Sequence, residues 1–281
     1  MTTIEIRKAL YEDKEKLVIV EAKSTPNLRY VPHVFNQFLE DKRGEFCVAE
    51  IDGEMVGCAK FTITPNGSAW VETLRVIPER QGLGVGKRLY QRFFEIAERE
   101  EVSTMRMYTG INNAVSKGLA EQAGFQLEAT FCGMSLQCDP SSAVISPPAF
   151  HPITDPRQAT ALIMEHSLDW NDFLVMNRTF YKLTPELCAY LVQLGQVYQE
   201  PISGSVVVLG ARFMPEQALH LGLFAGDHDV CLQFARAKAA EIGVKQLSCL
   251  FPASALVTKQ ALGAHGFEPN AAEFIVMRGD V

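Results

Sequence analysis

Three glycines at alternate positions separate a predicted strand from a predicted helix in the first half of the chain. The loop Gln-Gly-Leu-Gly-Val-Gly-Lys spans residues 81–87, between an apolar strand at 69–77 and an amphipathic helix that reaches Glu100. Glycine lets the main chain close around an anion, and a helix N-terminus offers unpaired N–H groups and partial positive charge. The loop therefore predicts a pyrophosphate site, or, without a ligand, a tight turn from strand to helix.

The spacing within this loop excludes two common phosphate-binding patterns. A nucleoside-triphosphate loop needs GxxxxGK followed by Ser or Thr, but Gln81 stands five residues before Gly86 and Arg88 follows the lysine. A dinucleotide fingerprint that begins at Gly82 needs a glycine where Lys87 stands. The ligand is therefore expected to be a different phosphate carrier.

The pattern that does match is Gln-x-x-Gly-x-Gly, preceded by Leu-x-Val-x-Pro at 74–78. In this form the sequence resembles the GNAT N-acetyltransferase superfamily, whose motif binds the pyrophosphate of acetyl-coenzyme A (acetyl-CoA). The resemblance covers most of residues 3–137 and includes Asn112-Asn113 before Leu119 and Gly124-Phe125. It implies acetyl-CoA as cosubstrate, no metal, and cofactor-binding roles for ten residues: Leu74, Val76, Gln81, Gly82, Leu83, Gly84, Val85, Gly86, Lys87 and Asn113.

Alternating strands and single helices predict an α/β class fold, with a mixed (α+β) sheet. Asp52-Gly53 joins two alternating runs, 45–51 and 54–64, which is typical of a tight hairpin because both turn positions need positive φ. A stretch with three prolines interrupts the pattern at residues 139–150 and is the expected linker. We therefore expect an acetyltransferase domain at 1–138 and a second domain at 151–281.

The second half repeats part of the first. Residues 116–125 match residues 258–267, and residues 97–102 match residues 239–244 at the same offset of 142. The counterpart of the glycine loop is missing, because the strand at 218–224 passes through residues 225–229 into the next helix. This arrangement resembles two-module GNAT proteins, tandem copies of which one is degenerate.

Acetyl transfer to an amine requires a neutral nitrogen, so a carboxylate beside the acceptor is expected to take up a proton. Glu72 is the candidate base, and family members often use an acidic residue on this strand. A regular period of two places Glu72, Leu74 and Val76 on one face, with Thr73 and Arg75 on the other. Glu79 is the alternative base, and a solvated or ion-paired role for Glu72 remains open.

The proton donor for the leaving thiolate is less clear from the sequence. Many family members have a tyrosine after the leucine of the second motif, but Ala120 follows Leu119 here. Tyr108 is the candidate substitute, with a water molecule or direct release of the thiolate as alternatives. Buried packing is a competing interpretation of Tyr108.

Residues 26–40 fall where the family builds the wall of its acceptor site, and Tyr30 is the candidate substrate-binding residue beside Glu72. The predicted reaction is transfer of acetyl to a primary amine of a small molecule or amino acid, by direct attack in a ternary complex. The alternative is a CoA-binding sensor or interaction protein without turnover. Arg80 and Arg88 are candidate phosphate contacts or solvated surface residues.

Charge and composition limit the kinds of binding partner and the cellular location that we expect. The 26 Lys and Arg residues against 33 Asp and Glu residues give a net charge of −7, which argues against general binding to nucleic acid or anionic membranes. The chain shows neither a signal peptide nor a membrane-spanning apolar run, and its seven scattered cysteines fit a reducing compartment. We expect a cytoplasmic protein, with self-association into a homodimer left open.

Overall fold

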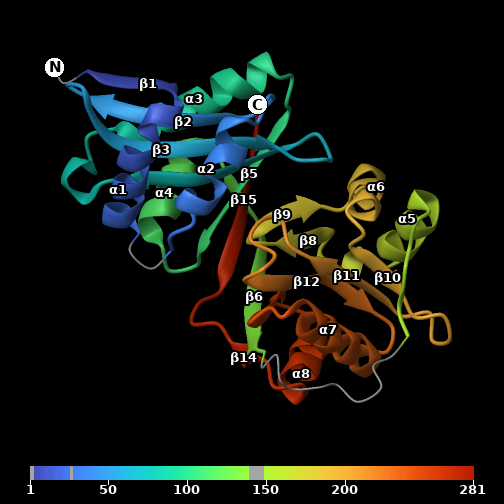
Figure 1. Ribbon diagram of the computed structural model, residues 1–281. Helices are drawn as coiled ribbons and strands as arrows, with labels where there is room; N and C mark the ends of the chain where they lie inside the picture. Colours follow the sequence, from blue (N-terminus) through green and yellow to red (C-terminus); the bar gives the residue numbers. More distant parts are fainter. Residues whose placement is uncertain (1–2, 26–27, 139–148) are drawn as a thin grey trace. The chain divides into compact units, whose positions relative to one another are not determined.

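The computed structural model describes residues 3–25, 28–138 and 149–281, so most of the predicted linker at 139–150 lies outside the described residues. Figure 1 shows the elements along the chain. The elements of the first half are β1 (Ile4–Lys8), α1 (Lys14–Ser24), α2 (Val31–Leu39), β2 (Glu45–Ile51), β3 (Glu54–Ile63), β4 (Ala69–Val76), α3 (Val85–Arg99), β5 (Thr104–Gly110), α4 (Ala114–Gln122) and β6 (Gln126–Gln137).

The elements of the second half are β7 (His151–Pro152), α5 (Pro156–Glu165), β8 (Phe173–Met176), β9 (Thr179–Lys182), α6 (Pro185–Gln193), β10 (Val197–Gln199), β11 (Val206–Gly210), β12 (Ala218–Ala225), α7 (His228–Ile242), β13 (Gln246–Pro252), α8 (Leu256–Ala264), β14 (Glu268–Pro269) and β15 (Phe274–Asp280). Short 3-10 helices lie at Tyr11–Asp13, Pro78–Arg80 and Leu168–Trp170. The predicted mixed α/β fold is confirmed.

The chain forms two compact units. The first unit contains Met1–Met107, Asn113–Leu127 and Met277–Val281, and the second contains Tyr108–Asn112 and Glu128–Val276. The end of β15 thus belongs to the first unit, whereas most of β6 belongs to the second. Each unit thus includes most or the end of a strand from the other half of the chain, which we call the exchange of last strands. The domain boundaries expected from sequence, 1–138 and 151–281, did not include it.

The first unit has the strand order β1-β2-β3-β4-β5, with the end of β15 next to β5. The predicted hairpin between β2 and β3 is confirmed, because Asp52 and Gly53 have φ values of 50° and 80°. The two faces carry different helices. Phe61 of β3 packs on Phe93 of α3, while the ammonium of the neighbouring Lys60 lies over the ring of Phe38 in α2.

A β-bulge in β4 corrects the predicted face assignment. Lys60 pairs with Glu72 and Cys58 pairs with Arg75, so β4 has one residue more than β3 between these two pairs. Thr73 in the bulge has a φ of 59°. Because Cys58 and Lys60 share a face of β3, Glu72 shares a face with Arg75 and not, as predicted, with Leu74 and Val76.

The other faces of β3 and β4 meet α3. Gly57 pairs with Val76, and a Cβ built on Gly57 would lie 3.3 Å from Val85 and 3.5 Å from Val76. Val76 therefore points toward the start of α3. Glu72 and Arg75 point toward the side of the sheet that α1 and α2 cover.

The contact between β4 and β5 is short. The parallel ladder comprises only Ala69 with Met105 and Trp70 with Arg106. Beyond Trp70, the edge of β4 away from β3 has no ladder partner among the described residues. A strand edge without a ladder partner is a place where a ligand can bind in an extended form, and Leu74 and Val76 lie on this part of β4.

The second unit has the order β6-β13-β12-β11-β10-β7, with β14 beside β6. Its elements repeat those of the first half at the predicted offset. Strand β13 begins 246 − 104 = 142 residues after β5, and α8 begins 256 − 114 = 142 residues after α4. Helices α3 and α7 both have 15 residues.

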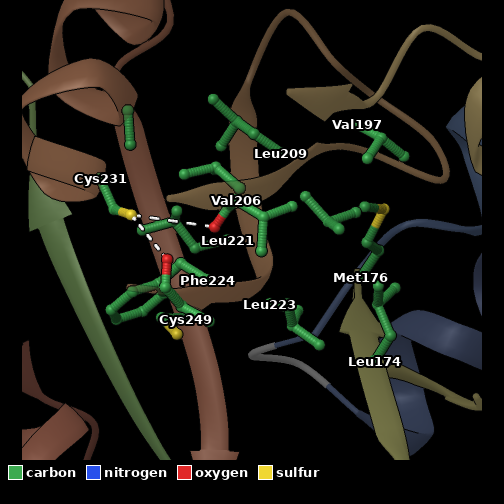
Figure 2. Close-up of a cluster of buried hydrophobic side chains, with 14 of the residues drawn as sticks. Leu174, Met176, Val197, Val206, Leu209, Leu221, Leu223, Phe224, Cys231 and Cys249 are labelled. Atoms are coloured by element: carbon green, nitrogen blue, oxygen red, sulfur yellow. Dashed lines mark hydrogen bonds between the residues drawn. The ribbon is translucent and has the colours of Figure 1, made fainter. Parts of the chain in front are cut away.

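The second unit also contains a hairpin, β8–β9, that the sequence analysis did not predict. It lies between α5 and α6, and Leu174 and Met176 of β8 pack against β12 at Gly222. A Cβ on Gly222 would lie 3.0 Å from Leu174 and 3.3 Å from Met176. Figure 2 shows both residues in the apolar core of this unit, which also includes Leu221 and Leu223.

Two further expectations concern membranes and cysteines. None of the helices in the described ranges is long and apolar enough to span a bilayer. All seven cysteines are free thiols, and five of them are buried. Cys132 on β6 and Cys138 just after it are partly buried and pack against the apolar core of the second unit.

Candidate functional site

The glycine loop leads into the N-terminus of α3. Gly82 and Gly84 have φ values of 78° and 90°, which glycine adopts without strain. Gly84 is the N-cap residue of α3, and no side chain of the described residues accepts a hydrogen bond from the N–H groups of this helix end. These donors and the helix dipole remain available to an anion.

Two motif residues also have structural roles. The side-chain amide of Gln81 donates to the carbonyl of Val76 at 3.0 Å and ties the loop to the end of β4. A Cβ on Gly86 would lie 2.6 Å from Cδ2 of Leu119, so glycine allows α3 and α4 to approach each other. Gly86 therefore serves helix packing whether or not a ligand binds.

The remaining loop residues lie at the surface. Leu83 is 52% exposed, and Lys87 is exposed near the start of α3. Arg80 forms an ion pair with Glu54 at 2.9 Å, and Arg88 donates to Gln91 at 2.7 Å. Lys87 is thus the loop cation without a recorded partner in the described chain.

Asn113 caps α4. Its Oδ1 accepts a hydrogen bond from the N–H of Ser116 at 3.1 Å, a typical N-cap contact. The cap fixes the side chain and leaves Nδ2 as a donor for a ligand. Ala120, at the family's usual tyrosine position, is completely buried in the same helix.

Glu72 lies in a polar environment on β4. Its side chain is buried to 9% exposure, and Oε1 accepts a hydrogen bond from the hydroxyl of Thr62 at 2.9 Å. Its cross-strand partner Lys60 is 1% exposed and donates to Oδ2 of Asp41 at 2.5 Å. The carboxylate is therefore held in place on the face that α1 and α2 cover.

Tyr30 immediately precedes α2 and reaches this face. Its hydroxyl lies 2.6 Å from the hydroxyl of Thr73 in the bulge, and its ring packs edge-on against Phe38. Glu21 of α1 accepts hydrogen bonds from the backbone N–H groups of Tyr30 and Val31 at 3.1–3.2 Å. The structure thus holds Tyr30 from both its backbone and its ring.

Sequence reasoning missed Glu21, Thr73 and Arg75 as parts of this site. Glu21 is 1% exposed, and its role as a distant helix cap has no sequence signature. The bulge lies where two polar residues, Glu72 and Thr73, stand between the apolar Val71 and Leu74, and this break in the alternation is the signal that could have indicated it. The predicted period of two placed Arg75 on the face opposite Glu72, whereas the structure places both residues on the same face.

Tyr108 lies in the second unit. Its ring packs against Phe180 at a centroid distance of 5.8 Å and against Phe274 at 5.9 Å. These contacts correspond to the packing interpretation of Tyr108. The structure places Tyr30, Glu72, the glycine loop and Asn113 in the first unit.

The second unit treats the corresponding helix end differently. Asp227 is the N-cap of α7, and its Oδ1 accepts from the N–H groups of Asp229 and Val230 at 3.0 and 3.2 Å. A carboxylate of the chain therefore occupies the place that a phosphate would take at α3. On β12 of the same unit, Leu174 and Met176 contact the strand at Gly222.

The two units have a mixed α/β architecture, and comparison with known proteins shows what the chain is similar to. Residues 6–125 match the Acetyltransferase (GNAT) family. A GCN5-related N-acetyltransferase from Sphaerobacter thermophilus is 15% identical with a TM-score of 0.69, over 99% of this chain and 95% of that chain. No curated protein matches the sequence.

Two other solved structures are also similar over nearly the whole of this chain. A tandem GNAT protein from the clavulanic acid biosynthesis pathway is 13% identical, with a TM-score of 0.62, over 99% of this chain and 98% of that chain. A GCN5-related N-acetyltransferase from Kribbella flavida is 13% identical, with a TM-score of 0.55, over 99% and 71%. At these identities the likeness establishes the fold.

Proposed function

We propose that the protein is an N-acetyltransferase that transfers acetyl from acetyl-CoA to a primary amine of a small molecule or amino acid. The observation that carries the proposal is the Gly82–Gly84 turn before the uncapped N-terminus of α3. This turn lies within the segment that matches the GNAT family. Amides there would bind the pyrophosphate, with Lys87 as a nearby cation.

The pantetheine arm would continue along the free edge of β4. Its amides would pair with backbone groups near Leu74 and Val76, beyond the short ladder to β5. Nδ2 of Asn113 would donate to the same arm. Leu83 and the backbone of Val85 would contact the carrier where the loop enters α3, and no metal is required for this reaction.

Acetyl transfer would proceed by direct attack. The amine nitrogen forms a bond to the thioester carbon, the C–S bond breaks, and CoA leaves as thiolate. Deprotonating an α-amine at pH 7 costs about 1 kcal/mol, whereas a lysine-type amine costs roughly 4–5 kcal/mol. Glu72 would accept the proton, directly or through water, and Tyr108 or water would protonate the thiolate.

The bulge adjoins the reacting groups on this proposal. Thr73 and Leu74 together face only Ala59 on β3, so part of their backbone has no partner in that ladder. An unpaired N–H there could stabilise the oxyanion that develops on the thioester carbonyl. The acceptor would enter from the side of Tyr30.

The second unit would be a degenerate copy that acts as scaffold. Asp227 fills the helix end that would bind phosphate, and the β8 side chains fill the space above β12. A sensor without turnover is the second candidate, favoured by the buried Ala120 in place of an acid and by the packed ring of Tyr108. For either function we propose a cytoplasmic location.

Two measurements test the proposal. Calorimetry with acetyl-CoA and with S-acetylpantetheine, which lacks the pyrophosphate and the adenosine, tests whether the phosphate-bearing half of the carrier contributes to binding. We expect clear binding of acetyl-CoA and at least about 100-fold weaker binding of the truncated carrier. Thiol release with a panel of amines separates the enzyme from the sensor, which would bind without turnover. Equal affinity for both carriers would refute the loop assignment.

A further inference from the structure

Arg75 shares with Glu72 the face of β4 that α1 and α2 cover. Their partners on β3, Cys58 and Lys60, are two residues apart, so Glu72 and Arg75 are separated by about 7 Å along the sheet. The bulge at Thr73 creates this relationship, because a regular strand would have placed Arg75 on the face of α3.

The guanidinium of Arg75 is poorly satisfied. Within the described residues it makes one side-chain hydrogen bond, from Nη1 to the carbonyl of Leu74 at 3.3 Å. Its Nε is buried and has no hydrogen-bond partner there. Arg75 as a whole is only partly buried, but a buried N–H of a charged group without an acceptor is unfavourable, and an anionic ligand would supply that acceptor.

The unused edge of Arg75 is the one that binds carboxylates elsewhere in the same unit. Arg7 donates through Nε and Nη2 to both oxygens of Glu50, at 3.2 and 2.6 Å. Arg92 donates through Nε and Nη2 to both oxygens of Glu45, at 2.8 and 3.0 Å. In Arg75 this pair of donors faces no carboxylate among the residues described.

The carboxylates of Glu21 and Glu72, on the same side of the sheet, accept hydrogen bonds from groups other than Arg75. Oxygen atoms of Glu21 accept backbone N–H groups at the start of α2, and Oε1 of Glu72 accepts from Thr62. Burial raises the pKa of the Cys58 thiol to about 12, while Arg75 lowers it and Glu21 raises it. Arg75 and Glu21 thus both act on Cys58, yet they do not form an ion pair.

We propose that the acceptor is an amino carboxylate, whose carboxylate binds Nε and Nη2 of Arg75 and whose amine lies toward Glu72. This inference rests on the proposed acetyltransfer and narrows its substrate class. The planar guanidinium of Arg75 can donate two parallel hydrogen bonds to a carboxylate. The short distance between Arg75 and Glu72 favours a ligand whose amine is close to its carboxylate, as in an α-amino acid. Arg75 is then a specificity residue of the first unit.

The test uses matched triads of amines: an L-amino acid, its carboxamide and its decarboxylated amine. Thiol release gives kcat/KM, and calorimetry on the CoA-loaded protein gives affinity. The variants are Arg75→Gln and Arg75→Lys, with Arg43→Gln as a matched control, because Arg43 is 64% exposed at a surface ion pair with Glu100. Thermal melting confirms that each variant is folded.

We expect the wild-type protein to prefer the carboxylate member of the best triad. Arg75→Gln should lower kcat/KM for that member at least about 30-fold and change the carboxamide less than about 3-fold. Arg75→Lys should recover part of the loss, and Arg43→Gln should match the wild type. Equal losses for all three members, or no preference in the wild type, would overturn the proposal.

Failure of the general function would look different. If no amine releases thiol, the proposed acetyltransferase activity is wrong, and calorimetry alone decides the role of Arg75. Carboxylate-selective binding that is lost in Arg75→Gln would support the site, and absence of binding would reject it. If the wild-type protein acetylates carboxylate-free amines as fast as the matching amino acids, the enzyme stands and only the acceptor class is wrong.

Discussion

The hydroxyl of Tyr30 lies 2.6 Å from the hydroxyl of Thr73 and links the start of α2 to the bulge of β4. Thr73 has a φ of 59°, so this contact joins a strained strand residue to the predicted acceptor wall. Movement of α2 would therefore disturb the strand between Glu72 and Arg75. This link makes Tyr30 a positioning residue as well as a candidate substrate contact.

Replacing Tyr30 with phenylalanine removes the hydroxyl and keeps the ring on Phe38. We expect the free energy of unfolding to fall by about 0.5–1.5 kcal/mol and KM for the amine to rise, with little change in acetyl-CoA affinity. Urea unfolding and steady-state kinetics measure both effects. The control is Tyr11→Phe, which removes an exposed hydrogen bond to Glu40. Unchanged amine kinetics in Tyr30→Phe would exclude a role at the acceptor site.

Replacing Glu72 with glutamine keeps the shape and removes the base. We expect kcat to fall by about 100-fold or more while calorimetric affinity for acetyl-CoA stays the same. Glu79→Gln is the matched control, because Glu79 is exposed near the loop and is the alternative base. A full loss in Glu79→Gln with normal rates in Glu72→Gln would exchange the two roles.

Replacing Gly84 with aspartate tests the anion site at α3. The carboxylate would stand at the helix end, as Asp227 does in the second unit, and would repel the pyrophosphate. Gly84→Asn is the control, since both side chains must adopt the same φ of 90°. We expect aspartate to weaken acetyl-CoA binding at least about 10-fold more than asparagine. Equal effects by calorimetry would mean that backbone strain alone matters.

Turns containing glycine were predictable from sequence, and those without it were not. Asp52-Gly53 identified the hairpin of β2 and β3. The β8–β9 hairpin turns at Asn177 and Arg178, which have positive φ without glycine. Oδ1 of Asn177 accepts from the N–H groups of Arg212 and Phe213, so distant residues stabilise this turn. A local pattern cannot reveal such support.

The candidate site was predictable in its cofactor loop and less so in its acceptor face. The glycine spacing depends on local chain geometry, which the sequence contains directly. The side on which Arg75 lies depends on the bulge at Thr73, and the position of Tyr30 depends on Glu21 in another helix. These features arise from tertiary packing, which overrides a regular period of two.

Because His220 on β12 is buried, we predict that the stability of the second unit depends on pH. Burial, with a contribution from Arg178, lowers the pKa of His220 to about 4, and neither ring nitrogen has a hydrogen-bond partner in the described chain. The unfolded chain, with an ordinary pKa near 6.5, therefore binds more protons between pH 6.5 and 4. The free energy of unfolding should fall by up to about 3 kcal/mol over this range as the pH falls.

Urea unfolding at a series of pH values measures this slope. His220→Leu should remove most of it, whereas His265→Gln, at an exposed contact with Asp229, should keep it. An identical slope in wild type and His220→Leu would show that other groups cause the acid sensitivity.

The exchange of last strands predicts that residues 277–281 stabilise the first unit. Met277 is completely buried, the N–H of Val281 donates to the carbonyl of Ser103 at 3.1 Å, and Gly279 lies against Phe125. Deleting these five residues should lower the free energy of unfolding by about 2–5 kcal/mol or more. This range is typical for loss of one buried methionine side chain. Acetyl-CoA binding should weaken with the unfolding of this unit.

Calorimetry and urea unfolding of the shortened chain provide the measurement. Deletion of Val281 alone is the control. Because its side chain is half exposed, the free energy of unfolding should fall by only about 1 kcal/mol. Gly279→Val tests the same contact in the full chain, since an added Cβ would lie 2.7 Å from the ring of Phe125. Unchanged stability in both the deletion and Gly279→Val would mean that the first unit folds without the end of β15.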